Sequence, residues 1–139
     1  MKFKSITMEN FMRYKGVNTI EFSCDPGKNV TVVLGDNTVG KTTIAQAFRF
    51  GLYGAVNMEK WKNADDYQLL NNDVLAFMDA DSKAAVSVTI VAADEEKQYT
   101  ICRKTIYSRN YPQMTCREFQ KKVSIKIADL QASDVVTEV

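Results

Sequence analysis

The stretch from Gly35 to Thr42 limits what this chain can fold into more than any other part of the sequence. It has the pattern G-x-x-x-x-G-K-T. That pattern is typical of a loop whose backbone N–H groups surround the phosphates of a nucleotide, provided that a strand precedes it and a helix follows. The run from Val30 to Leu34 is apolar and rich in β-branched residues, which predicts a strand buried on both faces. Behind the loop, apolar residues recur at helical spacing and predict a helix from about Lys41 to Tyr53.

Each residue type in the loop has a chemical reason to be there. Gly35 and Gly40 permit positive φ angles and close approach of the backbone to an anion. A helix that begins near Lys41 directs its unpaired N–H groups and the positive end of its dipole at the phosphates. Lys41 is expected to contact the β- and γ-phosphates, and the Thr42 hydroxyl is expected to ligate Mg²⁺. Asp36 is expected to point outward, because a carboxylate repels phosphate.

The composition excludes several classes of function. The chain has 139 residues and a net charge of +1, which fits one domain without a strongly basic surface. It has no histidine, so the Ser-His and Cys-His nucleophile systems and the usual catalytic zinc sites are excluded. Its three cysteines have no C-x-x-C spacing and predict reduced thiols in a cytoplasmic protein. No signal peptide and no apolar run long enough to span a membrane is visible.

The remaining elements follow from alternation and turn residues. Residues 2–11 and 17–23 predict two antiparallel strands beside the strand of the phosphate loop. Phe3 is out of phase with the alternation, which a bulge or a strand start near Lys4 would explain. Gly51 and Gly54 mark the end of the predicted helix. Residues 55–83 predict one or two short helices. A second hairpin is expected from residue 84 to residue 102, with its turn at 94–96, and a last strand is expected at 123–127.

Three stretches together resemble a known family. They are MKFKSITMENFMRYKGVNTIEF, VTVVLGDNTVGKTTIAQAFRFGLYG and AVSVTIVAADEEKQYTICRK. They are similar to the N-terminal half of the ATPase head in the SMC-like family. This family includes the double-strand-break-repair and SbcC/RecF-type ATPases, whose heads belong to the ABC class. The ATPases of bacterial DNA phosphorothioation and other anti-phage defence systems share this start. The resemblance covers roughly residues 1–107 and is strongest over residues 1–54.

The resemblance implies an α/β fold of the P-loop NTPase (ABC-ATPase-like) type, a mixed sheet with antiparallel hairpins flanking the loop strand and its helix. It implies ATP and Mg²⁺ as cofactors, with Lys41 catalytic and Thr42 at the metal. A basic residue after Asn10-Phe11 is expected near the nucleotide, and here it is Arg13, one position later than in the family. The nucleotide contacts implied in this way are Gly35, Asn37, Thr38, Val39, Gly40, Lys41, Thr42, Thr43 and Arg13.

The resemblance also implies a larger machine. The family's glutamine loop, signature sequence, Walker B acid pair and switch histidine have no match here, and no heptad repeat is visible. Residues 1–139 are therefore expected to form the N-terminal lobe of a head whose C-terminal lobe and coiled coil are not in this sequence. That lobe would supply the acid that orients the attacking water. The implied partners are DNA, a second head in a head-to-head dimer and a nuclease or defence protein, with no membrane involved.

Two other readings of the sequence stay open. Residues 74–79 and 90–95 each place an acid after an apolar run, as a Walker B strand does. If either were real, the chain would be a small P-loop kinase or GTPase; a binding module without turnover is a third class. Alternation over Val86–Ile90 argues for a half-exposed strand, and the first run favours a helix. A group of basic residues with nearby tyrosines has two interpretations, a surface that binds the DNA backbone or an ordinary solvated strand face. Its members are Arg103, Lys104, Arg109, Arg117, Lys121, Lys122, Tyr107 and Tyr111.

Overall fold

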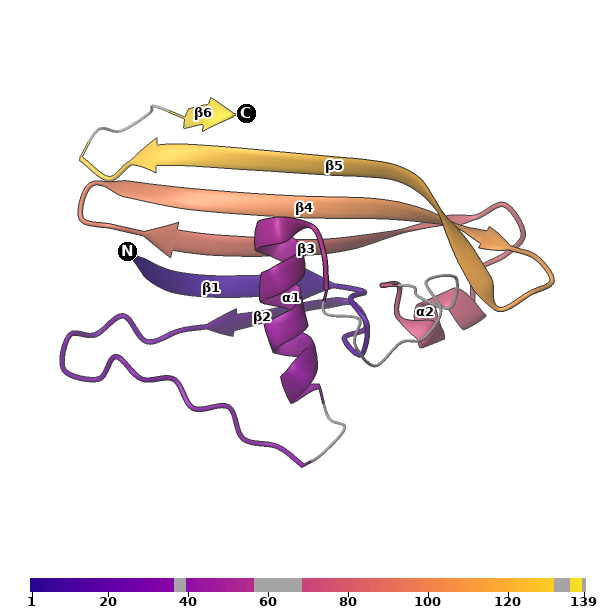
Figure 1. Cartoon of the computed structure of the whole chain (residues 1–139), viewed down its shortest axis with the longest axis horizontal. Coiled ribbons are helices and arrows are strands. Elements are labelled where there is room, and N and C mark those ends of the chain that lie inside the picture. The colour runs from indigo at the N-terminus through magenta and orange to yellow at the C-terminus, as the bar shows by residue number, and fades with distance from the viewer. Residues whose placement is uncertain (37–39, 57–68, 132–135, 139) are drawn as a thin grey trace.

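The computed structural model describes residues 1–36, 40–56, 69–131 and 136–138. Within these described ranges, one long helix and one short helix accompany six strands (Figure 1). In chain order the elements are β1 (Lys2–Glu9), β2 (Val17–Glu21), α1 (Lys41–Tyr53), α2 (Asn72–Ala76), β3 (Lys83–Ala93), β4 (Lys97–Asn110), β5 (Thr115–Asp129) and β6 (Val136–Glu138).

The strands form one sheet in the order β2-β1-β3-β4-β5-β6, and α1 runs across one face of it (Figure 1). Both predicted hairpins are confirmed, β1 with β2 and β3 with β4. The last predicted strand, 123–127, is the C-terminal part of the longer β5. The expected mixed sheet is wrong for the described part of the chain, where every neighbouring pair of strands is antiparallel.

A bulge in β1 determines which side chains meet α1. The register of β1 against β3 shifts between Phe3 and Ser5, which confirms the irregularity expected near Lys4. The shift brings Phe3 onto the same face as Ile6, and the Phe3 ring centroid lies 5.1 Å from that of Phe48 on α1. Without the bulge, the period of two would direct Phe3 to the opposite face of the sheet.

The core lies between α1 and one face of the sheet. The buried residues of α1 are Thr43, Ala47, Phe50 and Gly51, whose spacing gives the helix a single buried stripe. The buried apolar residues of the sheet include Ile6, Met8, Val86, Val88, Ile90 and Tyr107. The opposite face of the sheet is largely polar. There the hydroxyls of Thr7 and Thr19 lie 2.9 Å apart, and Ser87 Oγ donates to Glu9 Oε2 over 3.0 Å.

The run from Val30 to Leu34 does not form the predicted strand. Val30, Val32 and Leu34 are 75%, 70% and 88% exposed, and the segment has no ladder partner among the described residues. Within this run, Thr31 Oγ1 accepts a hydrogen bond from the Ser23 N–H over 2.9 Å. A buried strand needs a neighbour on each edge. The first hairpin does not supply one: β1 pairs with β2 and β3, and β2 lies at the edge of the described sheet with β1 as its neighbour.

The region between α1 and β3 agrees with the sequence where the structure describes it. α2 is one of the expected short helices, and Asn71 caps it by accepting from the N–H groups of Asp73 and Val74. The rest of that expectation, over residues 57–68, lies outside the described residues. Across the described chain, neither helix has the length and apolar character needed to cross a bilayer.

Candidate phosphate-binding site

The N-terminus of α1 lies where the sequence predicts it. The helix begins at Lys41, directly after Gly40 with φ of 110° and ψ of 7°, which lies in the region that favours glycine. It ends at Tyr53, because Gly54 adopts φ of 77° and donates its N–H to the Phe50 carbonyl over 2.8 Å. The predicted bounds are therefore confirmed. The sequence also predicts that Gly51 marks the helix end. In the structure Gly51 lies inside the helix and packs against β3.

The electrostatics of this helix end favour an anion. In the described part of the chain no side chain caps the N-terminus of α1, and its first turn carries no acidic residue. The first N–H groups of a helix have no partner within the helix, and the aligned peptide dipoles place partial positive charge there. Lys41 and Thr42 are both exposed at this end and can meet a ligand from solvent. The arrangement can bind a phosphate group.

Lys41 connects the helix to the start of the loop. Its Nζ donates a hydrogen bond to the carbonyl of Gly35, so the lysine side chain folds back across the loop that it follows. The ammonium group thus lies at the loop backbone, where a bound phosphate would need positive charge. Asp36 is exposed, as expected.

The other predicted contacts differ in where they lie. Thr43 is 4% exposed on the buried stripe of α1, so its side chain packs inside the protein and only its backbone is close to the site. Arg13 is exposed on the bend between β1 and β2. Asn37, Thr38 and Val39 fall outside the described residues. The sequence analysis did not identify Tyr14, which follows Arg13 and whose hydroxyl donates to the Gly40 carbonyl over 3.4 Å.

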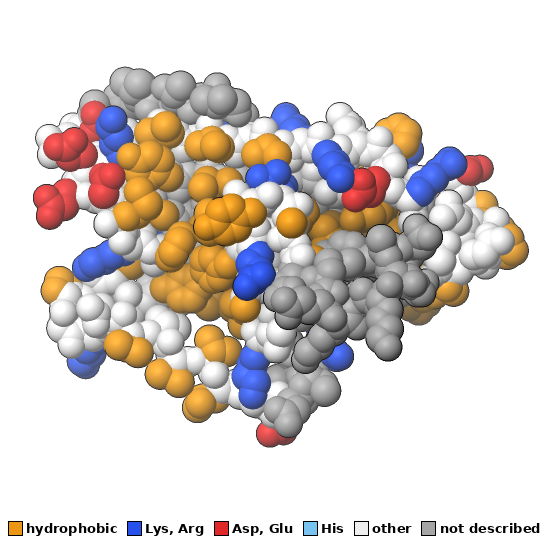
Figure 2. Space-filling model, viewed as in Figure 1, with side chains coloured by type: hydrophobic (Ala, Val, Ile, Leu, Met, Phe, Trp, Pro, Cys, Tyr) orange, Lys and Arg blue, Asp and Glu red, His pale blue; other side chains and the backbone are white. Residues whose placement is uncertain are grey.

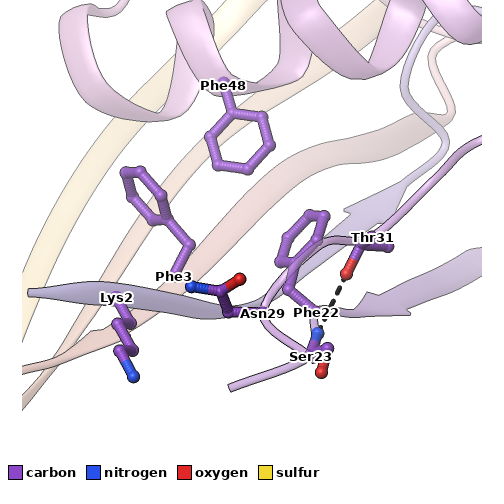
Figure 3. A pocket seen from close by; sticks show the side chains of 7 residues that line it. All are labelled: Lys2, Phe3, Phe22, Ser23, Asn29, Thr31 and Phe48. Carbon is purple, nitrogen blue, oxygen red and sulfur yellow. Dashed lines mark hydrogen bonds between the residues drawn. The ribbon is translucent and has the colours of Figure 1, made fainter. Parts of the chain in front are cut away.

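A separate cavity of about 340 Å³ lies beside the middle of α1 (Figure 3). Three phenylalanine rings, of Phe3, Phe22 and Phe48, gather there, and the Phe22 and Phe48 centroids are 5.8 Å apart. Its other lining residues are Lys2, Ser23, Asn29 and Thr31. Phe48 lies about 10 Å along the helix from Lys41, at 1.5 Å per residue. The cavity is therefore not part of the phosphate site.

Two members of the basic group, Arg103 and Arg109, help to hold the fold together, whereas Lys104, Arg117, Lys121 and Lys122 are exposed. Arg103 Nε donates to the Gly51 carbonyl at the end of α1 over 3.4 Å, and Arg109 donates to the Met78 carbonyl beyond α2. Tyr107 is buried, and this burial raises its pKa. A buried ring cannot stack on a nucleic-acid base. These three side chains favour the ordinary strand-face interpretation over a DNA surface.

Neither Walker B-like stretch has the geometry that it would need. Residues 74–76 belong to α2, so the first stretch is helical as expected. The second ends at the turn between β3 and β4, where the Asp94 carboxylate accepts the N–H groups of Lys97 and Glu96 over 2.7 and 2.9 Å. These bonds lower the Asp94 pKa. Its strand is antiparallel to both neighbours, whereas a Walker B acid follows a parallel strand.

Comparison with known proteins agrees with this geometry. The sequence profile of the AAA domain family matches residues 5–137 and so includes the loop from Gly35 and the whole of α1. No curated protein matches the chain. The match spans nearly the full length of the sequence and covers every element except the first residues of β1 and the end of β6. The chain therefore belongs to the AAA domain family, a family of nucleotide-binding P-loop ATPase domains.

Proposed function

We propose that the chain binds ATP with Mg²⁺ at the loop between Gly35 and Thr42. The observation that carries the proposal is the uncapped start of α1 with Lys41 folded over the loop that precedes it. Lys41 would contact the terminal phosphates and is the catalytic residue of this lobe, because its charge offsets negative charge that builds up there. Backbone N–H groups of Gly40, Lys41, Thr42 and Thr43 would hold the phosphates.

The residues present suit both parts of the ligand. The Thr42 hydroxyl is exposed on the first turn, as a group that ligates Mg²⁺ beside a phosphate must be. Arg13 lies on the bend between β1 and β2, directly before Tyr14, which contacts Gly40. Arg13 would therefore approach the nucleotide from the side of this bend. Bound Mg²⁺ would supply charge neutralisation for attack of water on the γ-phosphate. The acid that orients the water would come from outside this chain.

We further propose that the chain is the N-terminal lobe of a larger ATPase head. The support is the exposure of the run from Val30 to Leu34, which in a P-loop fold is an interior strand. Further polypeptide would cover this run and carry the water-activating acid. Following the family resemblance, the whole protein would be a cytoplasmic SMC-like DNA-repair or defence ATPase that dimerises head to head, binds DNA and acts with a nuclease or defence partner.

Lys41→Ala tests the nucleotide site. Loss of a charge-assisted contact typically costs ~1.5–3 kcal/mol, which corresponds to a Kd for Mg-ATP that rises by about tenfold to a hundredfold. The measurement is titration with a fluorescent ATP analogue in the presence of Mg²⁺. Lys28→Ala is the matched control, because Lys28 is an exposed lysine on the loop before the Val30–Leu34 run. Equal affinity of Lys41→Ala and the unmodified chain for the ATP analogue would refute the proposed site.

Turnover tests the two-lobe proposal separately. This chain alone is expected to bind Mg-ATP without hydrolysing it at the rates of about 1 to 1,000 s⁻¹ typical of enzymes. A protein that carries both lobes is expected to hydrolyse ATP and to lose that activity with Lys41→Ala. Phosphate release by the isolated chain at an ordinary enzymatic rate would show that no second lobe is required.

A further inference from the structure

The ring of Tyr14 lies against the glycine at which α1 begins. A Cβ atom added to Gly40 would lie 3.2 Å from both Cε2 and Oη of Tyr14 and 3.3 Å from Cζ. Contacts of that length are tighter than nearly all real Cβ contacts. The Tyr14 hydroxyl donates to the Gly40 carbonyl over 3.4 Å. The phenol therefore fills the space beside Gly40 and bonds to its backbone.

The bend that carries Tyr14 is fixed by hydrogen bonds at its start. Asn10 Oδ1 accepts from the Gly16 N–H over 2.9 Å, and Asn10 Nδ2 donates to the Ala85 carbonyl over 3.1 Å. Asn10 and Met12 both have φ of 49°, a conformation that L-residues adopt only when their surroundings hold it. Tyr14 itself donates its N–H to the carbonyl of the buried Phe11 over 2.9 Å.

A second group of bonds holds the middle of the same bend. The buried Asn71 donates from Nδ2 to the Met12 carbonyl over 2.8 Å and from its backbone N–H to the Asn10 carbonyl over 2.9 Å. The Met12 N–H donates to the Leu69 carbonyl over 2.6 Å. The bend is thus tied to β3 and to the segment before α2. Its position is set independently of the phosphate loop.

Gly40 is the residue whose conformation decides how the first turn of α1 faces a ligand. Its carbonyl accepts the first helical hydrogen bond, from the Ile44 N–H over 3.2 Å, and also the bond from Tyr14. The direction of that carbonyl fixes the peptide plane that carries the Lys41 N–H. A tyrosine with its ordinary pKa of about 10 keeps its proton at neutral pH, and burial raises the pKa of Tyr14 further, so the phenol remains a donor.

We propose that Tyr14 is a positioning residue for phosphate binding, which holds Gly40 so that the N–H groups at the start of α1 converge on the anion. This rests on the proposed nucleotide site and adds a residue to it. Tyr14 acts through Gly40 and does not itself need to contact the nucleotide. A purely packing role would affect folding without changing the affinity for phosphate.

The test is Tyr14→Phe, which keeps the ring and removes the hydroxyl. Loss of one hydrogen bond corresponds to about a threefold to tenfold change in an equilibrium constant. Mg-ATP and inorganic Mg-tripolyphosphate are both expected to bind that much more weakly, while the Tm of the ligand-free chain falls by no more than the few degrees that loss of one hydrogen bond implies. Without ligand, the amide resonances of Lys41 and Ile44 are expected to shift. Tyr53→Phe is the control, because Tyr53 lies 78% exposed at the other end of α1.

Each other outcome overturns the proposal in a distinct way. Weaker binding of Mg-ATP alone would mean that Tyr14 contacts the nucleoside and does not position the loop. Unchanged binding of both ligands, while Lys41→Ala loses it, would refute the role of Tyr14 and leave the nucleotide site standing. A lower Tm with unchanged affinity would make Tyr14 a packing residue. Absence of binding by the unmodified chain would overturn both proposals.

Discussion

At the scale of single residues, Cys116 has a thiol whose protonation depends on its surroundings. It lies half-buried on β5, opposite Arg109 of β4. Burial, and secondly the negative charge of Glu118, raise the pKa of Cys116 to about 11. Because the thiolate is the reactive form, this cysteine is expected to be unreactive at neutral pH.

The titration of Cys116 gives a prediction for both labelling and stability. Its alkylation by iodoacetamide is expected to keep rising about tenfold per pH unit between pH 8.5 and 10, where an unperturbed thiol with a pKa of about 8.5 levels off. Unfolding releases the proton in this window, so stability is full below about pH 8.5 and falls as the pH rises toward 11. Peptide mass spectrometry resolves Cys116 from Cys24 and Cys102. Cys116→Ser should remove this part of the pH slope, and a labelling rate that levels off near pH 8.5 would contradict the raised pKa.

At the scale of elements, the contact between α1 and β3 depends on a glycine. A Cβ on Gly51 would lie 2.6 Å from Ile90 Cδ1 and 3.2 Å from Val88 Cγ1, and both of these residues are buried. The helix can approach the sheet this closely only because residue 51 has no side chain. Close approach is also what brings Phe50 and Ala47 into the core.

Gly51→Ala separates helix propensity from packing. Alanine gains ~1 kcal/mol of helix propensity over glycine, whereas overpacking costs ~1–3 kcal/mol, so a net loss of stability is expected. Adding Ile90→Val removes the colliding methyl group, and the double variant should be more stable than the sum of the two single changes predicts. Ala45→Gly, at an exposed position on the same helix, calibrates the propensity term. Urea unfolding measures all four, and a more stable Gly51→Ala would show that the contact is not tight.

The elements differ in how well local sequence determines them. The bounds of α1 are predictable because a glycine lies at each end of the helix. Gly40 precedes its first residue, Gly54 follows its last, and the apolar stripe lies between them. The hairpins are predictable because apolar and polar residues alternate along each strand, with turn residues between the strands. The conformation of the run from Val30 to Leu34 is not predictable in this way. A strand forms only where a neighbouring strand hydrogen-bonds to it, and the composition of the run does not show whether such a neighbour exists.

The same distinction holds at the candidate site. The loop glycines, Lys41 and Thr42 follow from a pattern of consecutive residues. Tyr14 does not, because its contact with Gly40 joins positions 26 residues apart and depends on the bend that Asn10 and Asn71 hold. An aromatic residue in a polar turn gives no indication of what it will touch once the chain has folded.

At the scale of the whole molecule, apolar side chains are unevenly distributed. Figure 2 shows hydrophobic side chains gathered over the sheet beside α1 and along the loop below it. The exposed large apolar side chains of the described residues include Val30, Val32 and Leu34. A contiguous exposed apolar patch on a small protein often marks a contact with another polypeptide.

Substitution of the exposed run tests whether it contributes to the stability of this chain. Val32→Lys with Leu34→Lys is expected to change the free energy of unfolding by less than ~0.5 kcal/mol for each substitution, since neither side chain is covered. Binding of the dye ANS and self-association in sedimentation should both decrease. Val88→Lys, at a fully buried position of β3, is the contrasting control and should unfold the chain. A drop of several degrees in Tm for the double lysine variant would mean that the run packs against the protein.

The polar side of the sheet, where Thr7 meets Thr19 and Ser87 meets Glu9, has a thermodynamic consequence for any larger assembly. Covering polar side chains that already bond to one another contributes little free energy, so added polypeptide would gain more by binding the side that carries α1. A polypeptide bound on that side would contact α1, the helix whose N-terminus forms part of the proposed phosphate site. Docking and nucleotide affinity would then be linked, and each would change the other's equilibrium by an equal factor.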